Sequence, residues 1–101
     1  MEFSIDQQSG QNYATLKGML TIKEKATFQT FLAKFLSPYI RSYKLNLAGI
    51  TRIDSIGLGM LLLLSNKADK NNAKIILESP QEQVKEALTI ASFDKIFQID
   101  N

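Results

Sequence analysis

The chain has 101 residues, 45% of them hydrophobic and 22% charged, and its formal net charge is only +2. These values are typical of one globular domain with a small core, and the scattered lysines argue against a nucleic-acid-binding face. The sequence contains no histidine and no cysteine, which excludes a Ser-His-Asp triad, a His-bearing metal site and a disulfide. We therefore expect a protein that is not an enzyme and carries no cofactor.

The sequence shows no targeting or membrane-spanning segment. No basic stretch followed by an apolar one stands at the N-terminus, and the longest apolar run, Ile56 to Leu64, is too short to span a bilayer. We expect a single cytoplasmic domain over residues 1–101, without membrane insertion.

The first third of the chain predicts a hairpin followed by a helix. Residues 2–7 alternate in polarity, 8–12 form a turn cluster and 13–20 predict a second strand, which the short connection makes antiparallel to the first. Thr21 and Glu24 have the spacing of a capping box, and Ser37-Pro38 ends the helix. The helix carries an apolar stripe at core-facing spacing: Phe28, Phe31, Leu32 and Phe35.

The remaining elements alternate between strand and helix. Residues 43–48 predict a strand, about 56–70 a helix, and 73–77 a central strand. Ser79 is the predicted N-cap of a last helix, with Pro80 and Glu82 in its first turn. The predicted buried positions of that helix are Val84, Ala87, Leu88 and Ala91. The apolar residues after Phe93 predict a short helical turn or an edge strand packed on the domain.

This order predicts an α/β fold. We expect a single mixed β-sheet of four to five strands, with an opening antiparallel hairpin, packed against α-helices.

The most informative stretch, residues 53–64, leads from a polar loop into the predicted second helix. Ser55 lies at the junction, where helix N–H groups favour a phosphate. Ser55 is either the helix N-cap, the commoner role for such a serine, or a phosphorylation site whose phosphate the amides of residues 56–58 would bind. Asp54 either orients that hydroxyl for a Mg²⁺-bearing kinase site or caps the helix, and Gly57 and Gly59 allow close approach.

On a helical wheel this helix has two apolar faces. The predicted core face comprises Leu58, Leu61, Leu62, Ser65 and Ala68. The opposite side comprises Ile56, Met60, Leu63 and Lys67. That side predicts either a protein–protein surface or a face covered by a neighbouring helix; Ile56 and Met60 favour the surface.

Residues 53–61 closely resemble the signature loop of the STAS domain, the fold of bacterial anti-sigma factor antagonists. Residues 18–21, 45–50 and 93–97 are similar to other elements of that family, so the resemblance covers nearly the whole chain. Two departures stand out: Thr21 and Asn46 occupy positions near the expected docking surface where aspartate is common.

The resemblance implies a partner switch. In that family the unphosphorylated antagonist binds a GHKL-type serine kinase that also serves as an anti-sigma factor, and binding releases a sigma factor or another client. The kinase uses ATP and Mg²⁺ to phosphorylate the loop serine, which corresponds to Ser55. A PP2C-type phosphatase reverses the modification.

Two other functions compete with this one. A STAS module can be a constitutive subunit of a multiprotein complex, for example in lipid transport or biofilm regulation, with Ser55 only a cap. A nucleotide-binding module is the second, but no Walker A element supports it.

Overall fold

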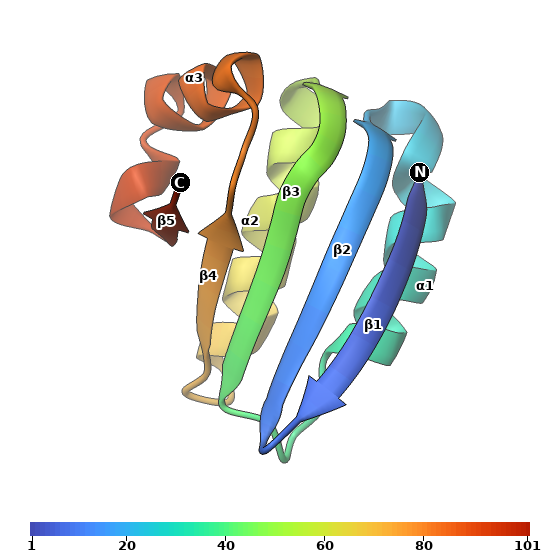
Figure 1. The fold of residues 1–101 in the computed structure, drawn as a ribbon, viewed down its shortest axis with the longest axis vertical. Coiled ribbons are helices and arrows are strands. Elements are labelled where there is room, and N and C mark those ends of the chain that lie inside the picture. Colours follow the sequence, from blue (N-terminus) through green and yellow to red (C-terminus); the bar gives the residue numbers. More distant parts are fainter.

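A computed structural model describes all 101 residues and has one five-stranded sheet (Figure 1). The strands lie in chain order: β1 (Glu2–Gln8), β2 (Gln11–Leu20), β3 (Ser42–Ile53), β4 (Lys74–Glu78) and β5 (Gln98–Asp100). β1 is antiparallel to β2, and every later pair is parallel. The predicted α/β fold with a mixed sheet is therefore confirmed.

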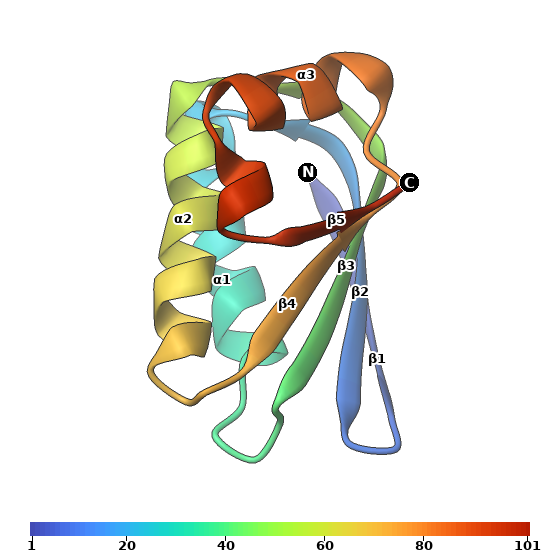
Figure 2. The same cartoon turned by 90° about the vertical axis from the view of Figure 1, so that its left-hand side faces the viewer.

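The helices leave one face of the sheet open. α1 (Lys25–Phe35) and α2 (Ser55–Asp69) lie side by side on the other face, and α3 (Glu82–Ile90) crosses one end of the sheet (Figure 2). Two 3-10 turns, η1 (Ile22–Glu24) and η2 (Phe93–Lys95), precede α1 and β5. The tail thus forms both a short helical turn and an edge strand. None of the helices combines the length and apolar character that a membrane span requires.

The core between the sheet and the two helices is rich in aromatic rings. The predicted stripe of α1 is fully confirmed, because Phe28, Phe31, Leu32 and Phe35 are all buried. Phe31 lies 5.3 Å from Phe3 and 4.8 Å from Phe35, and Phe35 lies 5.0 Å from Tyr43, measured between ring centroids. These ring contacts, edge-on to Phe3 and tilted to Tyr43, join α1 to β1 and β3.

β3 is longer than predicted and continues through residues 49–53. β4 pairs with it only as far as Asn46, which leaves the last part of β3 without a strand on that side. Two glutamine side chains from the start of α3 cover this edge: Gln81 Nε2 donates to Ala48 O at 2.7 Å, and Gln83 Nε2 donates to Thr51 O at 2.9 Å. These bonds satisfy carbonyl groups that a neighbouring strand would otherwise bind.

Two predicted helix starts are wrong. α3 begins at Glu82 with Gln81 as N-cap, whereas Ser79 has a left-handed φ of 54° before the helix. The capping box at Thr21 does not form either, because a 3-10 turn separates this residue from α1 and its hydroxyl donates to Glu24 Oε1 at 3.4 Å. The second Glu24 oxygen accepts from the amino group of Met1 at 3.2 Å. Of the predicted α3 stripe, Val84 and Leu88 are buried and the two alanines are half-buried.

The predicted core face of α2 is rotated from the observed one. Met60 is 7% exposed and belongs to the buried core, so its predicted place on an uncovered stripe is wrong. Leu62, predicted to be buried, is exposed. The buried residues of α2 are Gly57, Met60, Leu61, Leu64, Ser65 and Ala68.

Candidate functional site at the start of α2

Asp54 fixes the start of α2 to the end of β2. Its Oδ1 accepts a hydrogen bond from the Gly57 amide at 2.8 Å, and its Oδ2 accepts one from the Ile22 amide at 3.2 Å. The Asp54 amide donates to Leu20 O at 3.3 Å. Asp54 is therefore the helix N-cap, and one carboxylate connects two segments that are far apart in the sequence.

Gly57 allows α2 to approach β2 this closely. A Cβ atom at this position would collide with the carbonyl oxygen of Leu20 and lie 2.9 Å from Ile53 Cγ1. Any side chain would push the first turn of α2 away from the sheet. The close approach that Gly57 permits is therefore that of α2 to the Leu20 carbonyl within the fold.

Gly59 differs from Gly57, because it is exposed and nothing lies within 4 Å of the place a Cβ would occupy. Glycine in a helix costs about 0.5–1 kcal/mol relative to alanine. No contact within the domain requires it.

Ser55 is the first residue of α2 and is exposed. Because Asp54 provides the cap, the interpretation of Ser55 as N-cap is wrong, and no hydrogen bond ties its hydroxyl to the rest of the chain. Of the three amides predicted to bind a phosphate, two are already used: Gly57 N–H by the Asp54 carboxylate, and Leu58 N–H by the Asp54 carbonyl at 2.9 Å. The Ile56 amide lies in the first turn, where N–H groups have no acceptor within the helix.

Exposed apolar side chains lie beside this serine and further along α2. Ile56 is 42% exposed, as predicted for a protein–protein surface. Leu63, for which the sequence left a covered face open, is 41% exposed. Ile22 is also exposed. Its backbone N–H donates a hydrogen bond to the Asp54 carboxylate, which places Ile22 and its half-buried neighbour Thr21 beside the loop. Ile22 was not predicted at this surface, because the capping-box spacing of Thr21 and Glu24 places it in the first turn of a helix.

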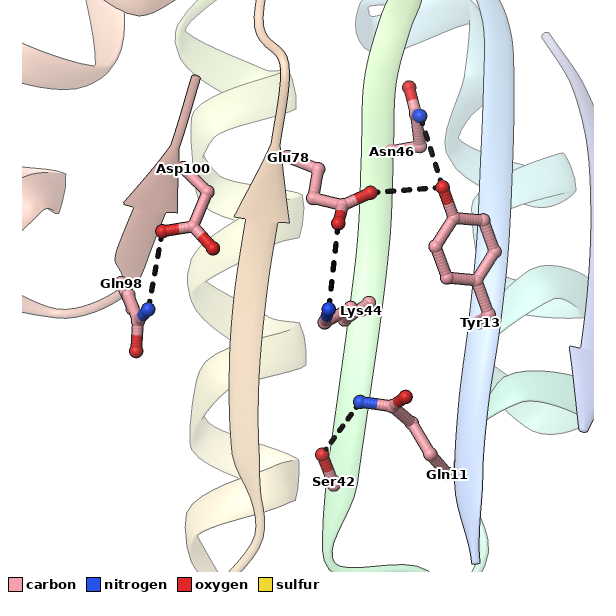
Figure 3. A network of polar contacts seen from close by, with 8 residues as sticks. All are labelled: Gln11, Tyr13, Ser42, Lys44, Asn46, Glu78, Gln98 and Asp100. Atoms are coloured by element: carbon pink, nitrogen blue, oxygen red, sulfur yellow. Dashed lines mark hydrogen bonds and ion pairs between the residues drawn. The ribbon is translucent and has the colours of Figure 1, made fainter. Parts of the chain in front are cut away.

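The structure does not bring Asn46 to this surface. Its neighbours in β3, Leu45 and Leu47, face the core, so Asn46 lies on the open face of the sheet. There its Nδ2 donates to Tyr13 Oη at 3.1 Å (Figure 3). Its Oδ1 accepts from the Ala48 amide at 2.8 Å. The predicted grouping of Asn46 with Ile56 and Thr21 is therefore wrong.

Comparison with protein families decides the class of this domain. A model of the STAS domain matches residues 4–101. The chain belongs to the STAS family. A STAS-domain containing protein of Pseudomonas aeruginosa is 41% identical to it over 59 residues, a match that covers 58% of this chain and 58% of that protein. The chain thus matches little more than half the length of this relative.

Solved STAS structures share the fold. A candidate anti-sigma factor antagonist from Thermotoga maritima superimposes with a TM-score of 0.84 at 22% identity, covering 98% of this chain and 86% of that one. For the anti-sigma factor antagonist SpoIIAA of Bacillus in its unphosphorylated form, the values are 0.68 and 15%, covering 99% and 88%. The STAS domain of a SulP transporter from Vibrio cholerae gives 0.73 and 18%, covering 88% and 70%. The fold therefore occurs in both antagonists and transporter domains.

Proposed function

We propose that this STAS domain is a phosphorylation-switched anti-sigma factor antagonist. It binds a GHKL-type serine kinase while Ser55 is unmodified and releases it after phosphorylation, and a PP2C-type phosphatase resets it. The observation that carries the proposal is the exposed Ser55 hydroxyl, which is free because Asp54 caps α2 in its place. ATP and Mg²⁺ are bound by the kinase and not by this domain. The proposal places the reaction in the cytoplasm, where the kinase has access to ATP.

A phosphate on Ser55 changes the charge of the loop. It adds about −1.5 to −2 charges next to the Asp54 carboxylate and competes with that carboxylate for the Gly57 amide. The positive end of the α2 dipole offsets part of the repulsion. The result is a strongly anionic loop beside the apolar side chain of Ile56, which disfavours a partner that docks on that side chain.

The switch requires no change of fold. SpoIIAA resembles this chain equally well in its unphosphorylated and phosphorylated forms, with TM-scores of 0.68 and 0.67. A surface charge that blocks docking accounts for switching without a change of fold.

The intact mass of the protein purified from its host tests the modification. We expect an added mass of one phosphate under at least one growth condition, and none in the Ser55→Ala variant. Thr51→Ala is the control, because Thr51 is also exposed near the loop and its loss must leave the phosphate in place. A chain that is unmodified under every condition would contradict the proposal.

Binding to the kinase tests the switch itself. Ser55→Ala should bind as the unmodified protein does, whereas Ser55→Asp and Ser55→Glu should bind at least tenfold more weakly, since each adds a charge beside Asp54. Titration calorimetry with the purified kinase measures the difference. Equal affinities for all three variants would show that charge at this position controls nothing.

A constitutive role is the second candidate, supported by the transporter STAS domain that shares this fold. In such a complex the exposed side chains of Ile22, Ile56 and Leu63 would form a permanent interface. The mass measurement separates the two, because a permanent subunit requires no phosphate on Ser55.

A further inference from the structure

One side of α2 carries an ordered series of exposed residues, which we call the α2 stripe. Its members are Ile56, Gly59, Leu63, Lys67 and Lys70. Their spacings of three and four residues place them along one side of the helix. The stripe begins beside Ser55 and runs for about 21 Å at 1.5 Å per residue, so it is apolar at one end and cationic at the other.

The apolar end has the geometry of a socket. Ile56, Gly59, Met60 and Leu63 stand at i, i+3, i+4 and i+7, the four positions that receive one side chain of a facing helix. Met60 lies at the buried side of this socket. On the solvent side the socket is open, because Gly59 has no side chain and nothing lies within 4 Å of the place a Cβ would occupy. No contact within the domain requires glycine at position 59. A second helix could pack closely against α2 there, because no side chain stands between them.

The stripe continues into a groove between α1 and α2, which lie side by side (Figure 2). The groove has a volume of about 680 Å³. Its apolar lining comprises Leu32, Ala33, Leu36 and Leu63. A groove between two helices with an apolar floor suits the apolar side of a third helix.

The charge of the groove defines its occupant. Lys67 and Lys70 line it, neither is in an ion pair, and no acidic residue lines it. The nearest acidic residue in the sequence, Asp69, lines a different hollow beside Phe97. A bound segment with acidic residues would complement the positive charge of these two lysines.

We propose that the α2 stripe binds an amphipathic helix of about four turns that belongs to the partner kinase and is acidic at one end. A large apolar side chain enters the socket over Gly59, and acidic residues face Lys67 and Lys70. The anionic end points away from Ser55, so phosphorylation acts on the apolar end. This inference rests on the proposed function only for the identity of the partner.

Photo-crosslinking in the host tests the occupant. The photoreactive residue p-benzoylphenylalanine replaces Leu63 in the full chain, and in the control it replaces Ile90, which is 77% exposed on α3. We expect position 63, and not position 90, to crosslink to one kinase segment with apolar residues at helical spacing and acidic residues at one end. A crosslink to a second copy of this chain, to a basic or extended segment or to lipid would overturn the proposal, as would no crosslink at 63.

Charge reversal then tests the groove, with a synthetic peptide of the crosslinked segment as the probe. Fluorescence anisotropy should show at least tenfold weaker binding and a smaller salt dependence for the Lys67→Glu, Lys70→Glu double variant. The Lys85→Glu, Lys95→Glu double variant has the same net charge and should bind normally. Gly59→Leu should also bind at least tenfold more weakly, with circular dichroism confirming that each variant is folded.

The two proposals fail in different ways. If the peptide binds as expected but Ser55 is never phosphorylated, the switch is wrong and the docking surface stands. If Ser55 is phosphorylated but charge reversal at Lys67 and Lys70 leaves binding unchanged, the docking surface is wrong and the switch stands.

Discussion

Gly57 faces the core and Gly59 faces solvent, so the same substitution should have opposite effects at the two positions. Gly57→Ala forces a Cβ against the Leu20 carbonyl and should cost about 2 kcal/mol or more of the free energy of unfolding. Gly59→Ala meets open space in a helix and should add about 0.5–1 kcal/mol. Urea unfolding measures both values. Changes of the same sign in the free energy of unfolding would show that the first turn of α2 does not pack as described.

Asp54 combines two functions that substitution can separate. Asp54→Ala removes the cap and the Ile22 contact and should cost about 1–2 kcal/mol of unfolding free energy. Asp54→Asn retains an oxygen for the Gly57 amide, because asparagine caps helices as well as aspartate does, and should cost less than half as much. Urea unfolding measures the costs, and hydrogen exchange should show faster exchange of the Ile22 amide in both variants. Equal costs would mean that the cap contributes little.

The residue scale also shows where sequence reasoning reaches its limit. Asp54 and Ser55 are both good capping residues, and neighbouring positions in a sequence do not reveal which one caps. The choice depends on contacts with Leu20 and Ile22, more than thirty residues away. The sequence predicts the loop and its chemistry, but tertiary contacts assign the roles.

At the scale of elements, α1 was predictable because its four large apolar residues follow a helical period between polar ones. α2 was predictable in extent but not in orientation. Every residue from 56 to 64 is apolar or glycine, so the helical wheel offers no contrast by which to choose a buried side. The helical wheel predicted that Leu62 is buried, whereas in the structure Met60 is buried against the sheet and Leu62 is exposed.

The buried aromatic series makes α1 sensitive to the loss of a large side chain. Phe31 is fully buried between Phe3 and Phe35, and Phe31→Ala should lower the free energy of unfolding by about 3–5 kcal/mol. Tyr39→Ala, at a side chain that is 89% exposed, should change it by less than about 0.5 kcal/mol. Thermal or urea unfolding measures both. A loss of less than 1 kcal/mol for Phe31→Ala would contradict the described core.

At the scale of the whole molecule, the two faces of the sheet have different chemistry. α1 and α2 cover the apolar face, and the open face carries a polar network in which Glu78 Oε1 accepts from Tyr13 Oη at 2.9 Å and Glu78 Oε2 lies 3.7 Å from Lys44 Nζ (Figure 3). The side chains of Lys44 and Glu78 are half-buried, and solvent still screens an ion pair at such positions, so we assign this network mainly to keeping the face hydrophilic. The element order predicted the sheet, but the pairing of Asn46 with Tyr13 depends on a register that alternation alone does not define.

The strand order has a consequence for biosynthesis. Each strand pairs with the one made just before it, so no strand has to insert between two earlier ones as the chain leaves the ribosome. The residues that shape the Ser55 loop lie between Leu20 and Gly57, so all of them are translated before β4 and β5. The loop can therefore take its final shape against β2 while the C-terminal strands are still being translated.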